Sequence, residues 1–273
     1  MFNQLLKNLR QPSPASAPGP RAGDSLGALQ ERAPLRQHFE ILYAGARFGQ
    51  LDYADLFWRC ANDTDTAIYP ANLFRRAQGG INLARYFLAT FAIPGRRAEC
   101  GVYRGLSSLL VCRAARAVHP DFDGGGMHLF DSFERFSAPT EFDMIPVRNE
   151  GGVMRMQPPF PPNYRLNTSF DEVTQALAEF PGLAIQRGWL PQVLQQLPEA
   201  AWSFVHLDVD LYEPTLGGLA YFFPRLSPGG VIITDDYGAE RYPGARKAWE
   251  QFCGERKIPY IVLATGQAVI MRV

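Results

Sequence analysis

The chain has 273 residues, of which 47% are hydrophobic and 20% are charged, so it is long enough and apolar enough to bury a sizeable core. Lys and Arg together number 27, as do Asp and Glu, and a formal net charge of zero argues against a broadly basic nucleic-acid-binding surface. No apolar run reaches the roughly 18 residues of a membrane helix, and residues 1–10 do not resemble a secretory signal. The four cysteines show no CxxC spacing, so we expect neither a zinc cluster nor a disulfide framework, and we predict a reducing, cytoplasmic location.

The first 95 residues are predicted to precede the main domain. Apolar residues at helical spacing predict a short helix within residues 1–10, and the many prolines up to residue 24 predict that the N-terminal segment 1–24 ends as a flexible linker. Residues 25–95 are predicted to form a mostly helical extension or cap. Its clearest helix covers 81–91 and stops near Pro94 and Gly95.

From residue 96 to 273, short apolar runs alternate with helical patterns, which predicts the main α/β domain. We expect strands at 97–102, 127–130, 183–186, 204–207 and 231–234, helices at 106–118, 215–226 and 243–253, and a closing hairpin of 260–263 with 268–271. Residues 227–230 are predicted to be the turn after the second of these helices. The alternation predicts a seven-stranded, mostly parallel sheet with helices on both faces, to which the terminal hairpin adds an antiparallel strand.

Residues 137–168 interrupt this alternation with six prolines and several Phe, Tyr and Met side chains. A loop of that length inside a compact domain is usually functional or disordered, and its aromatic content favours a lid or a wall of the substrate site. A surface insertion without a role is the alternative.

A glycine turn follows the first strand of the main domain, in the segment Glu99-Cys-Gly101-Val-Tyr-Arg-Gly105. Strand–Gly–helix turns are common to doubly wound folds, and the fingerprints GxGxxG and GxxxxGK[ST] are absent, which disfavours NAD and ATP. Asp131 ends the next strand, where a carboxylate suits the two hydroxyls of a ribose. Capping of the segment that follows is the alternative role for Asp131.

Four aspartates follow two later strands, and in a parallel sheet the strand ends meet at one edge. Asp208 and Asp210 lie two apart and would share a face in an extended chain, while Asp235 and Asp236 close the next strand. Three converging carboxylates form a hard oxygen site suited to Mg²⁺, with a fourth available as a general base. Helix and turn capping would explain one or two of them. His206, within an apolar strand, is interpreted as a buried histidine with a satisfied hydrogen bond.

From about residue 69 to 253 the sequence resembles the TylF/macrocin O-methyltransferase family, whose members methylate sugar hydroxyls of natural products with S-adenosylmethionine. The motifs that carry the resemblance are Ala98–Gly105, Phe130–Glu134, His206–Thr215, Leu226–Gly230 and Thr234–Tyr237, followed by Pro243–Trp249. The resemblance implies a Rossmann-like class I methyltransferase fold. It also implies a Mg²⁺-dependent enzyme with a small-molecule hydroxyl acceptor, most readily a glycoside, in a homo-oligomer without nucleic-acid partners.

The same resemblance assigns site residues. It implies that Asp208, Asp235 and Asp236 hold Mg²⁺ and that Asp210 is the catalytic base. It implies that the cofactor is bound by Glu99, Gly101, Tyr103, Ser107, Asp131, Ser132, Gly188, Trp189 and Asp208, with Gly188 and Trp189 at the adenine. Two alternatives remain: methylation of a catechol or another small phenol, and a protein that binds S-adenosylmethionine without turnover.

Overall fold

The computed structural model describes residues 36–37, 39–148, 152–161 and 164–273. The predicted helix in 1–10 and the predicted linker up to residue 24 lie outside the described residues. The chain divides after Leu42, and the second unit, Tyr43–Val273, holds all of the elements named below. In the first unit, Arg36 Nε donates to Glu40 Oε1 at 2.9 Å.

A seven-stranded sheet forms the centre of the second unit, as predicted. Its order is β10 (Ile261–Val262), β11 (Ala268–Met271), β9 (Leu226–Thr234), β8 (Trp202–Leu207), β3 (Arg96–Cys100), β4 (Met127–Asp131) and β7 (Ala184–Arg187). β11 is antiparallel to both of its neighbours, β10 and β9, and the strands from β9 to β7 all pair in parallel. The predicted antiparallel addition by the terminal hairpin is therefore confirmed.

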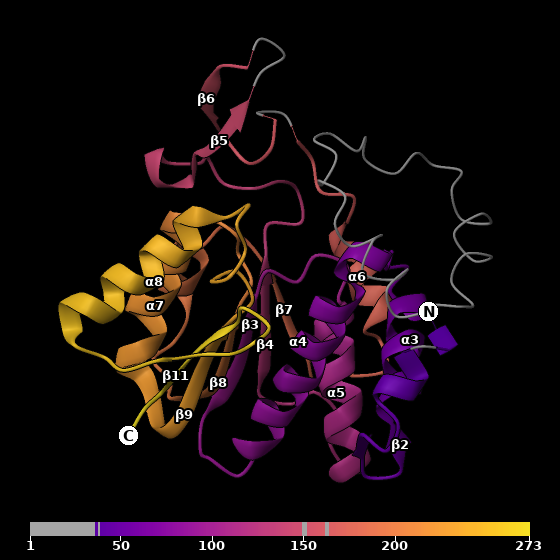
Figure 1. Cartoon of the computed structure of the whole chain (residues 1–273). Helices are drawn as coiled ribbons and strands as arrows, with labels where there is room; N and C mark the ends of the chain where they lie inside the picture. Colours follow the sequence, from indigo (N-terminus) through magenta and orange to yellow (C-terminus); the bar gives the residue numbers. More distant parts are fainter. Residues whose placement is uncertain (1–35, 38, 149–151, 162–163) are drawn as a thin grey trace. The chain divides into compact units, whose positions relative to one another are not determined.

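Helices cover both faces of the sheet (Figure 1). α3 (Tyr53–Asp63), α4 (Pro70–Ala89), α5 (Leu106–Val118) and α6 (Phe170–Ala176) lie on one face, and α7 (Tyr212–Phe222) and α8 (Pro243–Arg256) lie on the other. A two-residue hairpin, β1 (Arg47–Phe48) and β2 (Leu51–Asp52), leads into α3, where Asp52 Oδ1 accepts from Ala54 N at 2.9 Å and caps the helix. α3 and α4 belong to the same compact unit as the sheet, so the predicted boundary at residues 95 and 96 falls inside it. Among the described residues, no helix combines the length and apolarity needed to cross a bilayer.

Two predicted elements differ from the structure near residue 226. α7 begins at Tyr212 rather than 215, and the short 3₁₀ helix η3 (Phe223–Arg225) follows it. Residues 227–230, predicted as a turn, belong to β9, because Leu226 pairs with Trp202 before the register shifts. Gly229 permits the bulge with a φ of +79°, and its N–H donates to Arg272 O at 2.6 Å.

The 137–168 insertion contains regular secondary structure that its proline-rich sequence did not predict. It holds the 3₁₀ turn η1 (Glu141–Asp143) and the antiparallel pair β5 (Ile145–Arg148) and β6 (Met154–Gln157), above the carboxyl edge of the sheet (Figure 1). Asp143 is buried, and its Oδ1 accepts from Tyr212 N, the first residue of α7, at 2.8 Å. Arg241 donates to Pro159 O at 3.0 Å. The insertion is thus bonded to the helix starts beside the sheet edge.

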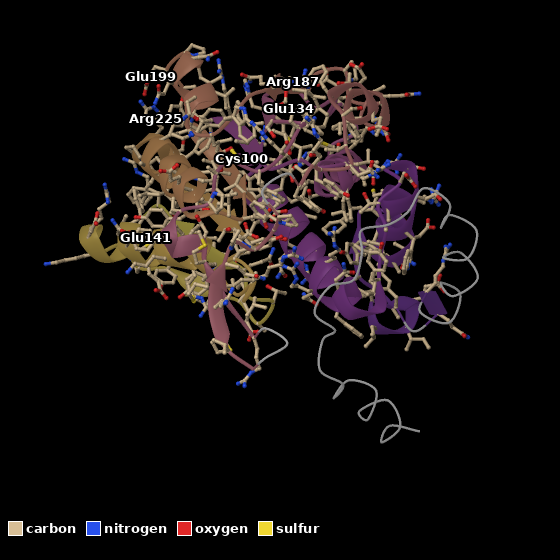
Figure 2. All side chains as sticks on the ribbon, turned by 90° about the horizontal axis from the view of Figure 1, so that it is seen from above. Cys100, Glu134, Glu141, Arg187, Glu199 and Arg225 are labelled. Carbon is tan, nitrogen blue, oxygen red and sulfur yellow. The ribbon has the colours of Figure 1, made fainter. Side chains whose placement is uncertain are left out.

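The interior is built from side chains of the sheet and the covering helices. Trp202, Trp249 and Phe222 are fully buried, and all four cysteines are buried and free. Figure 2 shows Cys100 among these interior side chains, whereas the ion pair of Arg225 with Glu199 lies at the periphery.

Candidate active site

Strand register aligns four predicted site residues along the carboxyl edge of the sheet. Thr234 pairs with Leu207, Leu207 with Cys100, and Cys100 with Phe130 across β9, β8, β3 and β4. The next residue of each strand path is therefore Asp235, Asp208, Gly101 and Asp131, in that order. Neighbouring loops then meet at this edge, which is where open α/β sheets bind ligands.

Gly101 is required by the close approach of two strand ends. Its φ is +87°, and a Cβ added there would lie 1.8 Å from the backbone oxygen of Asp208. No L side chain fits that space or favours that conformation. Gly105, with a φ of +89°, then turns the chain into α5.

Asp131 organises the turn through three backbone bonds. Its Oδ2 accepts from Val102 N at 2.8 Å and Tyr103 N at 2.9 Å, and its Oδ1 accepts from Phe133 N at 2.8 Å. No helix follows Asp131, so the bond to Phe133 is a local turn rather than a helix cap. The carboxylate still lines the cavity. It therefore has acceptor capacity facing a ligand while it holds the glycine turn in place.

Glu99 has a different position from the other predicted cofactor residues. Its side chain is 1% exposed, accepts from Ser107 Oγ at 2.5 Å and Ser108 Oγ, and lies 3.0 Å from His206 Nδ1. All predicted site residues except Glu99 line one cavity. The side chain of Glu99 supports Ser107 and His206 from beneath the cavity, and its direct contact with the cofactor stays a prediction.

His206 bridges two carboxylates beneath the edge. Its Nδ1 faces Glu99 Oε1 at 3.0 Å and its Nε2 faces Asp235 Oδ1 at 3.3 Å. Burial works to lower the pKa of His206, but the hydrogen bonds and charges of Asp235 and Glu99 outweigh it and raise that pKa well above its usual value. His206 is therefore buried with a carboxylate oxygen facing each of its ring nitrogens, consistent with its interpretation as a histidine with a satisfied hydrogen bond.

The four aspartates meet at the edge but not in an extended chain. β8 ends at Leu207, and Asp210 has a left-handed φ of +64°, so the predicted alternation of Asp208 and Asp210 does not apply. Asp210 N donates to Asp236 Oδ2 at 2.8 Å, which holds this conformation. The N-cap of α7 is Leu211, which rules out helix capping by Asp210. Asp208 and Asp210 nevertheless both line the cavity.

The pKa values of the four aspartates are shifted because their side chains are buried close to other charged groups. Burial, and then the charge of Asp235, raise the pKa of Asp208 to about 6. Burial and neighbouring carboxylates raise the pKa of Asp210 and of Asp236 well above the usual range. Burial works in the same direction on Asp235, but the bond and charge of His206 outweigh it and lower that pKa. A cation among these groups would relieve the repulsion.

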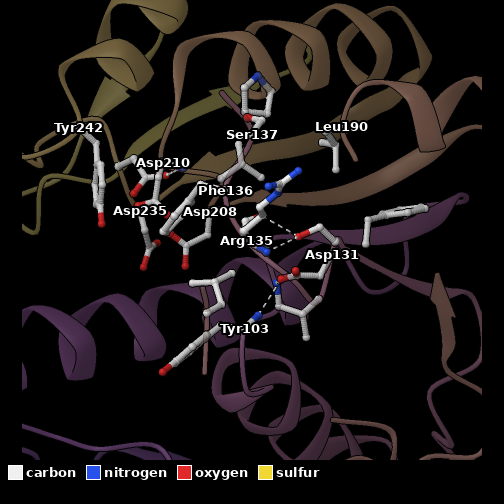
Figure 3. Close-up of a pocket in the computed structure, with 18 of the residues that line it drawn as sticks. Tyr103, Asp131, Arg135, Phe136, Ser137, Leu190, Asp208, Asp210, Asp235 and Tyr242 are labelled. Carbon is white, nitrogen blue, oxygen red and sulfur yellow. Dashed lines mark hydrogen bonds between the residues drawn. The ribbon is translucent and has the colours of Figure 1, made fainter. Parts of the chain in front are cut away.

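The cavity has a volume of about 370 Å³, within the range of small-ligand sites. Figure 3 shows Tyr242 with Asp208, Asp210 and Asp235 at one end, Asp131 and Leu190 at the other, and Phe136 and Arg135 between them. Phe136, Ser137, Tyr164 and Leu166 line it from the insertion and its flank. The insertion therefore lines the cavity, and its role as a lid or a wall of the substrate site stays a prediction.

The lining residues that sequence reasoning missed include Arg75, Arg76 and Tyr242. The two arginines lie in the second turn of α4, and Tyr242 immediately precedes α8. The only signal was the pairing of two adjacent basic residues in an otherwise weakly charged helix. These groups place positive charge and a phenol hydroxyl opposite the aspartates.

The contacts of His206 and the aspartates indicate which atoms could bind a metal ion. His206, Asp208 and Asp235 offer ligand atoms within 4.8 Å of one another. Both nitrogens of His206 already face carboxylate oxygens, so the oxygens of the aspartates are the donors left for a cation. An all-oxygen set fits Mg²⁺ rather than zinc.

Comparison with known proteins agrees with this geometry. The family model "Macrocin-O-methyltransferase (TylF)" matches residues 84–270. The chain is 30% identical over 154 residues, 54% of its length, to a Streptomyces olivaceus 8-demethyl-8-(2,3-dimethoxy-alpha-L-rhamnosyl)-tetracenomycin-C 4'-O-methyltransferase. It is 28% identical over 166 residues, 59% of its length, to a Micromonospora griseorubida mycinamicin III 3''-O-methyltransferase. The matches span 55% and 61% of the lengths of these two relatives.

Solved structures share the fold. The O-methyltransferase NovP superposes with a TM-score of 0.58 at 22% identity, covering 72% of this chain and 80% of that one. The calicheamicin methyltransferase CalS11 has a TM-score of 0.58 at 18% identity, covering 80% of this chain and 91% of that one.

Proposed function

Because this chain belongs to the TylF macrocin O-methyltransferase family, we propose that it transfers the methyl group of S-adenosylmethionine to a hydroxyl of a sugar, on a natural product or a glycan, with Mg²⁺. The observation that carries the proposal is the meeting of Asp208, Asp210, Asp235 and Asp236 in the same cavity as the glycine turn and Asp131. The two relatives named above, a rhamnosyl-tetracenomycin 4'-O-methyltransferase and a mycinamicin III 3''-O-methyltransferase, support a sugar acceptor over a catechol.

The cofactor would occupy the end of the cavity at Asp131. Asp131 would offer acceptor capacity to the ribose hydroxyls. Gly188 N donates to Asp131 O at 2.8 Å, so Gly188 and Trp189 lie beside Asp131 and would contact the adenine. Gly101, Tyr103, Ser107, Ser132 and Asp208 complete the proposed cofactor contacts.

The metal would lie at the other end, held by Asp208, Asp235 and Asp236. Bound S-adenosylmethionine supplies an electrophilic methyl group, and bound Mg²⁺ supplies positive charge that stabilises a developing alkoxide. The chain would contribute the carboxylate oxygens as ligands, while the two nitrogens of His206 face Glu99 and Asp235.

Asp210 is the proposed general base. Burial and Asp208 raise its pKa, which gives the carboxylate a higher proton affinity than a surface aspartate has. The bond from its own N–H to Asp236 fixes its backbone beside the metal ligands. Asp210 would accept the proton of the acceptor hydroxyl as the methyl group is transferred.

The acceptor would be enclosed by the insertion and by α4. Tyr164 and Phe136 supply flat apolar surfaces, and Arg75 and Tyr242 supply donors near the aspartates. We further propose a homo-oligomeric protein in the cytoplasm, without nucleic-acid partners.

Methyl transfer from labelled S-adenosylmethionine to a panel of glycosides and catechols tests the proposal. We expect transfer to a glycoside that EDTA abolishes and Mg²⁺ restores. Full activity in EDTA would remove the metal from the mechanism. Transfer to catechols alone would favour the phenol alternative, and cofactor binding with no transfer to any acceptor would favour a binding protein.

A further inference from the structure

We infer that Gln267 is a positioning residue that selects the oxygen Asp235 presents to the metal. Gln267 lies in the turn between β10 and β11, far in sequence from every motif above, and its side chain is 2% exposed. The inference rests on the proposed function, because it requires that Asp235 bind Mg²⁺.

The side-chain amide of Gln267 reaches the aspartate directly. Gln267 Nε2 donates to Asp235 Oδ1 at 2.7 Å, and to Gly79 O of α4 at a longer 3.4 Å. Asp235 Oδ1 also faces His206 Nε2 at 3.3 Å. Because Oδ1 is engaged by two donors, Oδ2 is the oxygen left for a cation.

The orientation of this amide is set by its other end. Gln267 Oε1 accepts from Asn82 Nδ2 at 2.9 Å and from Thr265 Oγ1 at 2.9 Å. Asn82 in turn accepts from Gln78 Nε2 at 3.3 Å. With two donors on its oxygen, the amide can only turn its nitrogen toward Asp235, so α4 fixes the direction of the bond.

The turn itself is held against the loop that carries the ligands. Gly238 N, two residues after Asp236, donates to Gly266 O at 2.8 Å. A Cβ on Gly238 would lie 2.5 Å from Gly266 Cα, so the two backbones approach as closely as glycines allow. Gln267 is therefore placed before any metal arrives.

Removal of the Gln267 side-chain donor should weaken Mg²⁺ binding more than it slows methyl transfer. Mutation of a residue that orients a metal ligand typically lowers the affinity for the metal by about 10- to 100-fold. We expect Gln267→Leu to raise the Kd for Mg²⁺ by about that factor, measured by titration calorimetry without acceptor. The Kd for S-adenosylmethionine should stay unchanged, and kcat at saturating Mg²⁺ should approach that of the wild type.

A matched control is Gln186→Leu, which removes a glutamine bonded to His128 at 3.0 Å on the far side of the sheet. It should leave the Kd for Mg²⁺ unchanged. Asn82→Ala provides a second variant that frees the amide to rotate, and it should weaken Mg²⁺ binding to a smaller extent than Gln267→Leu.

A Gln267→Leu protein with wild-type Mg²⁺ affinity overturns the inference while the proposed function stands. If that variant does not fold, Asn82→Ala decides, and unchanged Mg²⁺ affinity there overturns the inference equally. A wild-type chain that binds no Mg²⁺ refutes the proposed function and the inference together.

Discussion

Replacement of Asp131 by alanine should unfold the glycine turn as well as weaken the cofactor site. The side chain accepts backbone N–H groups from Val102, Tyr103 and Phe133, and two of those donor residues, Val102 and Phe133, are 2% and 3% exposed. An unpaired buried donor costs about 1–3 kcal/mol, so two of them predict a loss of about 2–6 kcal/mol in the free energy of unfolding. At about 2–4 °C per kcal/mol for a domain of this size, Tm should fall by about 4–24 °C.

Urea denaturation followed by tryptophan fluorescence, together with calorimetric Tm, measures this loss without any ligand. Asp123→Ala is the matched control, because the side chain of the exposed Asp123 accepts a single backbone bond, from Gly125 N at 2.8 Å. It should cost less than about 1 kcal/mol. If Asp131→Ala were as stable as the control, the assignment of Asp131 as organiser of the turn would be wrong.

Further predictions concern the strand ends, the base and the insertion. Gly101→Ala should destabilise the fold by about 3 kcal/mol or more in urea, because it adds left-handed strain to a clash with Asp208 O, whereas Gly254→Ala, with open space around it, should be neutral or stabilising. Asp210→Asn should lower kcat by about 10²–10⁴ with no rescue by excess Mg²⁺, while added Mg²⁺ should partly rescue Asp235→Asn; rescue of both would make Asp210 a ligand. Asp143→Ala should leave Tyr212 N–H unpaired and make the insertion more susceptible to limited proteolysis. It should raise KM for the acceptor with little change in the Kd for the cofactor. Equal proteolysis rates for the variant and the wild type would contradict an anchoring role of Asp143.

The sheet was predictable because its strands are short apolar runs between breakers. Parallel pairing then places the residue after each strand at one edge, so Asp208, Asp235 and Asp131 could be grouped without coordinates. Residues 227–230 were misassigned because a Pro-Gly-Gly sequence indicates a turn. In the structure the bulged first half of β9 uses the conformational freedom of these glycines instead.

The role of Glu99 was not predictable from its position alone. An acidic residue at a strand end looks the same whether it faces the cavity, as Asp131 does, or lies beneath it. The difference arises because β3 pairs with β8 and brings Glu99 opposite His206. Arg75 and Tyr242 were missed for a related reason, since they belong to no motif and reach the site only through packing.

The bond between Asn82 and Gln267 joins positions 185 residues apart in the chain. The loop that this bond closes is entropically costly. β11 also inserts between β10 and β9 rather than adding at the rim of the sheet. Pairing of β8 with β9 alone would thus bring Asp208 and Asp235 to one edge, yet the amide that orients Asp235 is in place only when the terminal hairpin has docked.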